Sequence, residues 1–150
     1  MADTDAITLL IDLATRTADS RLRDLAGALS REQSETERLR LLTDYRANYR
    51  KRLEIAQADG ISRQLLASYR QFIERLDGAI AQQGLVIEHR AADSARARED
   101  LSKAERHRKS LETVHERRAL AKRLITERRE QKQHDEFALR SNAQGGGFPH

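Results

Sequence analysis

The sequence contains no cysteine and no tryptophan, and its only proline is Pro149. Without cysteine there is no disulfide framework and no thiol chemistry. Without proline before residue 149, no position lacks a backbone hydrogen-bond donor, so long uninterrupted helices are possible. No apolar run approaches the roughly 20 residues that a membrane-spanning helix needs, and the start, MADTDAITLL, lacks the basic residues of a secretory signal. These absences favour a cytoplasmic protein built from helices.

Large apolar side chains are also scarce. Hydrophobic residues make up 38% of the chain, many of them alanine, while aromatic residues contribute only 4% and charged residues 35%. This composition favours a long, thin helical assembly over a compact domain with a deep core. The predicted fold class is therefore all-α, with one domain.

The clearest turn signal is the stretch ADGIS, residues 58–62. Gly60 can end a helix in the left-handed conformation, and Ser62 can cap the next helix. We therefore predict a first helix over about 5–57, a turn at 58–61 and a second helix over about 62–140. The ending SNAQGGGFPH, residues 141–150, predicts a disordered tail. Two long helices joined by so short a turn must form an antiparallel hairpin, in which the second helix is the longer.

Alternating steps of three and four residues indicate a coiled-coil seam. In the first helix the series is Ile11, Thr15, Ala18, Leu22, Leu25, Leu29, Thr36, Leu39, Thr43 and Leu53. In the second helix two rows follow the heptad: Leu66, Ile73, Ile80, Ile87 and Leu101, with Tyr69, Leu76, Ala97, Ala104, Leu111 and Ile125. Basic side chains interrupt these rows at Arg46, Arg50, Arg90, Arg108 and His115. The seam is therefore expected to be weak, and best formed near the turn.

Four of the six aromatic residues fall close to the turn: Tyr45, Tyr49, Tyr69 and Phe72. In this register Leu42, Tyr45 and Tyr49 each precede a seam position by one residue, which turns them about 100° away from it. A second apolar row lies beside the seam on the other helix: Leu65, Phe72, Ala79 and Val86. The surplus apolar surface predicts a docking site. A shifted register or a third chain would instead place the same side chains in a core.

The second helix is basic toward its end, because residues 103–132 hold eleven Lys/Arg and five Asp/Glu. Such a stretch suits an acidic protein surface, nucleic acid or anionic lipid. Its interspersed acids and the lack of aromatic residues between Phe72 and Phe137 favour a solvated helix face over a nucleic-acid site. A basic coiled coil that associates with nucleic acid or ribosomes remains the alternative.

Motifs for catalysis are missing. The glycine run at 145–147 has neither a strand before it nor a helix after it, so it is not a phosphate loop. Glu112 and His115 have the Glu-x-x-His spacing of a di-iron bundle, but such a site needs a second copy of the motif. We therefore expect no enzyme activity, no metal and no cofactor.

The order and spacing of three stretches resemble the FliJ family, the small coiled-coil component of the bacterial flagellar type III export apparatus. The stretches are LLTDYRANYRKRL (41–53), GIS with SYRQFIERLDGAIAQQ (60–83) and ITERREQKQHDEFALR (125–140). The resemblance implies an antiparallel coiled coil like the rotor stalk of rotary ATPases. It also implies a non-enzymatic protein at the inner face of the cell membrane, associated peripherally. The implied partners are the hexameric export ATPase and its regulator, the cytoplasmic domain of the export gate, and export chaperones. The same stalk in a virulence-type secretion system is a further alternative.

The resemblance also implies a gate-binding patch near the turn. The matching positions are Leu42, Tyr45, Tyr49, Phe72, Leu76, Ala79 and Gln83, with Arg38 at the edge; Gln83 and Arg38 are less typical of the family. For the ATPase ring we predict a basic contact surface together with the start of the first helix. This surface consists of Arg117, Arg118, Lys122, Arg123, Arg128 and Arg129. We expect it to lie on an overhang, because the second helix beyond about residue 115 has little of the first left to pair with.

Overall fold

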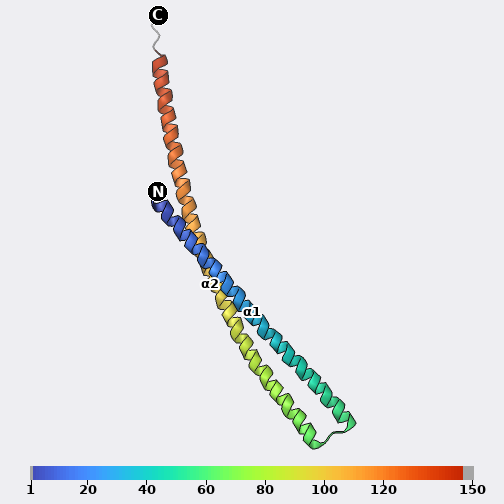
Figure 1. Cartoon of the computed structure of the whole chain (residues 1–150). Helices are drawn as coiled ribbons and strands as arrows, with labels where there is room; N and C mark the ends of the chain where they lie inside the picture. Colours follow the sequence, from blue (N-terminus) through green and yellow to red (C-terminus); the bar gives the residue numbers. More distant parts are fainter. Residues whose placement is uncertain (1, 147–150) are drawn as a thin grey trace. The chain divides into compact units, whose positions relative to one another are not determined.

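The computed structural model describes residues 2–146, and two helices account for nearly all of them. Helix α1 spans Ala2–Asp59 and helix α2 spans Arg63–Gly145 (Figure 1). The described residues contain no strand. The predicted fold class, an all-α antiparallel hairpin whose second helix is the longer, is confirmed.

Both helices extend beyond their predicted bounds. Helix α1 begins three residues earlier than expected, and α2 continues to Gly145, through residues that we had assigned to a disordered tail. That part of the prediction is wrong for 141–145: the stretch before the glycines contains alanine and glutamine, which prolong a helix readily. The last four residues of the predicted tail, 147–150, lie outside the described residues.

The turn is formed as its residues predict. Gly60 has φ = 86°, the left-handed conformation that costs a side-chain-bearing residue about 1–2 kcal/mol. Its amide donates to the carbonyl of Gln57 at 3.3 Å and so closes α1. At the start of α2, the Ser62 hydroxyl accepts a hydrogen bond from the Leu65 amide at 3.2 Å, which is an N-cap.

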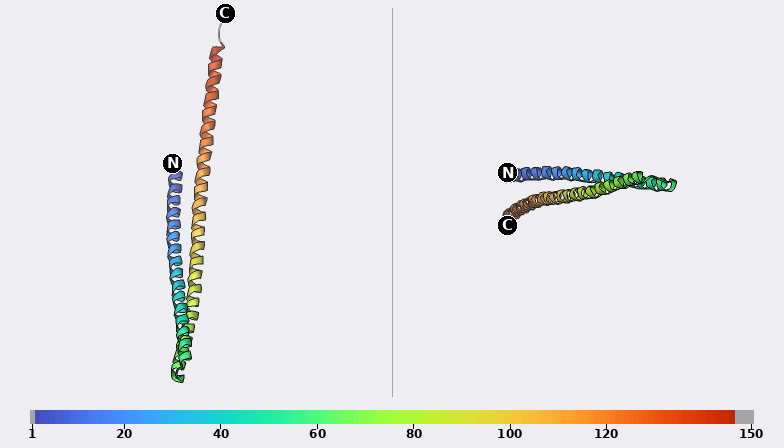
Figure 2. Two further views of the ribbon diagram at one scale, coloured as in Figure 1. Left: turned by 90° about the vertical axis from the view of Figure 1, so that its right-hand side faces the viewer. Right: turned by 90° about the horizontal axis from the view of Figure 1, so that it is seen from below.

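The helices pack as two units, each of which contains a stretch of α1 and a stretch of α2. The turn unit comprises residues 16–104, and the end unit comprises residues 1–15 with 105–150. Within the turn unit the two stretches run antiparallel and meet at the turn (Figure 2). Its buried apolar side chains are Ala18, Ala28, Leu53 and Leu76; those of the end unit are Ile7 and Ala14. Half of the buried apolar side chains in each unit are alanine, so apolar burial stabilises each unit only modestly.

The seam of α1 differs from the predicted one from Leu22 onward, since Leu22 and Leu29 are 54% and 40% exposed. Thr36 and Thr43 are exposed, while Glu35, Leu42 and Tyr49 are at least half-buried. Every second seam position therefore lies one residue earlier than expected, while Leu39 and Leu53 keep their places. The observed series continues the spacing of Ala18, Leu25 and Ala28: Glu32, Glu35, Leu39, Leu42, Arg46, Tyr49 and Leu53.

The reason for the difference is polar pairing across the helices. The prediction places Thr36 in the seam and treats Arg46 as an interruption, but Glu35 takes the place of Thr36, and both Glu35 and Arg46 find partners on α2. Arg46 forms an ion pair with Asp77, and this hydrogen bond raises the pKa of Arg46 above its ordinary value. Gln83 in turn bonds to Glu35. Partnered charges are tolerated in a seam, so polarity alone did not identify the register.

Candidate functional sites

An aromatic cluster lies beside the turn. The ring of Tyr49 is 4.3 Å from that of Phe72 and 5.4 Å from that of Tyr69, measured between centroids. Tyr45 extends the cluster, with its ring 6.0 Å from both Tyr49 and Phe72. The ring of Tyr45 meets that of Phe72 edge to face, an arrangement that aromatic pairs prefer. The four rings therefore join α1 to α2 in one contiguous group.

The members of this cluster differ in exposure. Tyr45 is 51% exposed, although it contacts two other rings. Tyr49, Tyr69 and Phe72 are half-buried, because they lie between the helices. The alternatives of core and docking site are thus not exclusive, because three residues of the cluster are half-buried and Tyr45 is exposed.

The other residues of the predicted gate-binding patch occupy different depths. Ala79 is exposed and Leu42 is half-buried in the seam. Leu76 is only 7% exposed, so its side chain belongs to the core of the turn unit. The amide of Gln83 points across the seam to Glu35. Arg38 is exposed and lies 3.5 Å from the Glu35 carboxylate.

A groove of about 390 Å³ continues the aromatic cluster toward the turn. It is lined by Tyr49, Leu65, Ser68, Tyr69, Gln71, Phe72 and Arg75. Sequence reasoning assigned Tyr69 to the seam and did not name Arg75. The sequence did contain a signal for Arg75. Arg75 follows Phe72 by three residues, and residues three or four apart share a face of a helix, so Arg75 extends the row that contains Leu65 and Phe72.

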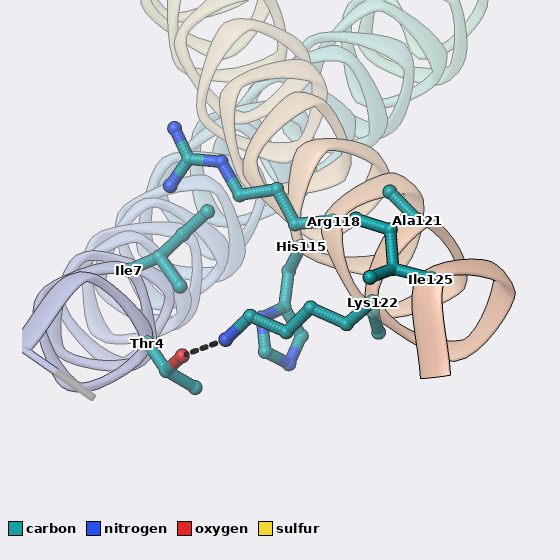
Figure 3. Close-up of a pocket in the computed structure, with 8 residues that line it drawn as sticks. Thr4, Ile7, His115, Arg118, Ala121, Lys122 and Ile125 are labelled. Atoms are coloured by element: carbon teal, nitrogen blue, oxygen red, sulfur yellow. Dashed lines mark hydrogen bonds between the residues drawn. The ribbon is translucent and has the colours of Figure 1, made fainter. Parts of the chain in front are cut away.

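The end unit carries a second groove, of about 430 Å³. Its lining residues are Thr4, Ile7, His115, Arg118, Ala119, Ala121, Lys122 and Ile125 (Figure 3). The Lys122 side chain crosses from α2 to α1, where its ammonium group donates a hydrogen bond to the Thr4 hydroxyl at 3.1 Å. Thus α1 remains beside α2 as far as residue 122. The overhang begins later than the predicted residue 115.

The six predicted ATPase-contact residues are all exposed, and the groove separates them into two sets. Arg118 and Lys122 line it, whereas Arg117, Arg123, Arg128 and Arg129 do not. Among the side chains that the structure describes, no carboxylate lies within ion-pair distance of any of the six. Sequence reasoning missed Thr4 and Ile7 as individual residues, although it included the start of the first helix.

The Glu112–His115 pair does not form part of a metal cluster in the described chain. Glu112 lies 3.9 Å from the Arg108 guanidinium, and His115 lines the groove of the end unit. Among the described residues, no three His, Asp or Glu side chains are grouped closely enough to hold a metal ion. Neither helix, over its described length, has an apolar stretch sufficient to cross a membrane.

The architecture defines the class of protein: a small helical hairpin with a weak coiled-coil seam, an aromatic cluster beside the turn and a basic second helix. Comparison with known families and proteins then supplies the particular family. The family described as "Flagellar FliJ protein" matches residues 4–147. The flagellar FliJ protein of Salmonella typhi is 32% identical over 142 residues, which cover 94% of this chain and 96% of the relative. The flagellar FliJ protein of Escherichia coli K12 is 31% identical over 142 residues, which likewise cover 94% of this chain and 96% of the relative.

The chain therefore belongs to the FliJ family. As a family member it is a component of the flagellar export apparatus, with a role in flagellum biogenesis and protein export. The family is a structural and export component rather than a family of enzymes.

Proposed function

We propose that this chain is a stalk that links the flagellar export ATPase ring to the membrane export gate, in the cytoplasm at the base of the flagellum. The turn unit contacts the cytoplasmic domain of the gate, and the end unit contacts the ATPase. Peripheral association with the membrane then follows from the gate contact. The regulator of the ATPase and the export chaperones are the further partners that the family resemblance implies.

The observation that carries this proposal is the exposed ring of Tyr45. A tyrosine that is 51% exposed while its neighbours Tyr49 and Phe72 are half-buried forms the open side of an apolar surface. Aromatic residues are enriched in the centres of protein–protein interfaces, because they bury large areas at low conformational cost. The adjacent groove at Leu65 and Arg75 enlarges this surface.

The charge of the end unit supports the contact with the ATPase. The six basic residues named above have no carboxylate partner within the described chain, so their charges are available to a partner's carboxylates. Long, flexible cationic side chains can also follow carboxylates that move as a ring changes shape. Screening by salt then predicts that binding to the ring weakens as ionic strength rises.

Two multiple variants test the proposal. The triple variant Tyr45→Ala, Tyr49→Ala, Phe72→Ala is expected to lose binding to the cytoplasmic domain of the gate and to impair motility. The quadruple variant Arg117→Glu, Arg118→Glu, Lys122→Glu, Arg123→Glu is expected to lose association with the ATPase and its stimulation. Each variant serves as the control for the other: the triple variant is expected to keep its binding to the ATPase, and the quadruple variant its binding to the gate domain. Circular dichroism checks that both stay helical.

The proposal fails if the charge reversal leaves binding to the ATPase intact and removes affinity for RNA instead. That result would assign the basic end to nucleic acid. It also fails at the turn if the single variant Tyr45→Ala, whose ring is half exposed, keeps the full affinity for the cytoplasmic domain of the gate.

A further inference from the structure

The groove of the end unit lies along the line of the seam, where side chains at the seam positions no longer fill the space between the helices. In α2 the spacing of three and four residues runs through Leu111, His115, Arg118, Lys122 and Ile125. At two of these positions stand Arg118 and Lys122, which are exposed; the Lys122 stem crosses the space between the helices, and its ammonium group reaches Thr4. Small neighbours, Ala119 and Ala121, add no bulk. A hollow therefore remains beside Ile7 of α1 (Figure 3).

The walls of this hollow are apolar and its rim is cationic. Ile7 is 5% exposed and forms the inner wall, whereas Ile125, 53% exposed, forms an outer one. None of the eight lining residues is acidic, while Arg118 and Lys122 are basic. A volume of about 430 Å³ lies within the roughly 300–1,000 Å³ typical of ligand pockets. An apolar side chain therefore fits the hollow.

The Lys122 ammonium group is satisfied only by a neutral acceptor. It donates to the Thr4 hydroxyl at 3.1 Å, and no carboxylate of the described chain lies within ion-pair distance. An ammonium group has three N–H donors, so Lys122 can bind a second acceptor beside Thr4. A carboxylate brought to this rim would add the attraction between two full charges to its hydrogen bond.

We infer that this groove is the specific docking point for the export ATPase, and that its occupant is an ATPase segment in which an apolar side chain adjoins a carboxylate. The apolar side chain enters beside Ile7, and the carboxylate pairs with Lys122 and Arg118. This inference rests on the proposed contact with the ring and specifies its chemistry. The first two turns of α1 are part of the site, because Thr4 and Ile7 form one wall.

A comparison of single charge reversals distinguishes a docking groove from a diffuse basic surface. Lys122→Glu and Arg123→Glu change the net charge equally at neighbouring exposed positions, but only Lys122 lines the groove. We expect Lys122→Glu to weaken the affinity of the full chain for the purified ATPase at least about tenfold, since it removes a charge that pairs within the interface. Arg123→Glu is expected to stay within about fivefold, as is usual for an exposed pair.

A second comparison leaves the charge unchanged. Ala121→Phe places a ring in the groove, and Ala138→Phe places the same ring on an exposed part of α2 that does not line it. We expect the first variant to lose affinity for the ATPase at least about tenfold, and the second to bind like the unmodified chain. Circular dichroism of both variants checks that helicity is retained.

The outcomes separate the inference from the proposed function. If the unmodified chain does not bind the ATPase, the proposed ring contact itself is wrong. If it binds, but Lys122→Glu and Arg123→Glu weaken binding equally, the contact is a diffuse charge surface and the groove has no special part. Unchanged binding of Ala121→Phe would overturn the inference as well.

Discussion

The side-chain amide of Gln83 donates hydrogen bonds to two oxygens of Glu35 across the helix pair: to its backbone carbonyl at 2.9 Å and to its carboxylate at 2.6 Å. The Glu35 side chain is only 13% exposed. An amide that must meet both oxygens of one residue fixes how α1 and α2 are aligned. A polar pair thus specifies the register of this seam at a point where apolar residues are missing.

We predict that Gln83→Leu lowers the free energy of unfolding by about 1–2 kcal/mol. The reason is that the nearly buried carboxylate of Glu35 loses its donor on α2, and an unsatisfied polar group is costly. Urea unfolding followed by circular dichroism measures the change. The double variant Glu35→Leu, Gln83→Leu should recover most of the loss. A single variant as stable as the parent would show that the bond does not hold the register.

Two glycine substitutions should act in opposite directions. Gly60→Ala forces a side chain into the left-handed conformation, so we expect a loss of about 1–2 kcal/mol in the free energy of unfolding. Gly78→Ala adds a methyl group in the middle of α2, where nothing lies within 4 Å, so we expect a gain of about 0.5–1 kcal/mol. Thermal unfolding of both variants under identical conditions checks the signs. If both substitutions changed the free energy of unfolding in the same direction, the assignment of the turn at Gly60 would be wrong.

The seam of the end unit contains an uncompensated polar atom at Arg108. Its Nε is buried without a hydrogen-bond partner, and the carboxylate of Glu112 lies 3.9 Å away. We predict that Arg108→Leu raises the free energy of unfolding by about 1 kcal/mol, because leucine removes the unsatisfied donor and fits a seam position. The matched control is Arg106→Leu, an exposed neighbour that should change stability by less than about 0.5 kcal/mol. Destabilisation by Arg108→Leu would show that the guanidinium is needed there.

The aromatic cluster should separate binding from stability. We expect Tyr45→Ala to lose affinity for the cytoplasmic domain of the gate with a small change in stability, because its ring is half exposed. Tyr49→Ala should also lower the free energy of unfolding, by about 1.5–4.5 kcal/mol, since it removes contacts with three rings that are each worth about 0.5–1.5 kcal/mol. Calorimetric titration and urea unfolding measure the two effects.

The control for the tyrosine variants is Leu85→Ala. Leu85 is 61% exposed on α2 of the same unit and does not belong to the predicted patch. The variant Leu85→Ala is expected to leave both the affinity for the gate domain and the free energy of unfolding unchanged. If Leu85→Ala weakens binding as much as Tyr45→Ala does, the contact is a general apolar one and the patch is not specific.

The sequence by itself determined the two helices and the turn, because these depend on residues that are close along the chain. Proline is absent up to Pro149, Gly60 adopts the conformation that only glycine adopts cheaply, and Ser62 caps the helix that follows. The position of the aromatic residues near the turn was equally readable, since a hairpin places residues on either side of its turn near one another.

Only the tertiary structure decided the register of the seam and the depth of each patch residue. Glu35 enters the seam in place of Thr36 because Gln83 on α2 satisfies it, and no pattern within α1 indicates that partnership or the one between Arg46 and Asp77. The groove of the end unit likewise requires Thr4 to meet Lys122, residues 118 apart along the chain. Such contacts depend on how two helices align over their whole length, and that alignment is set by the sum of many small pairings rather than by any local motif.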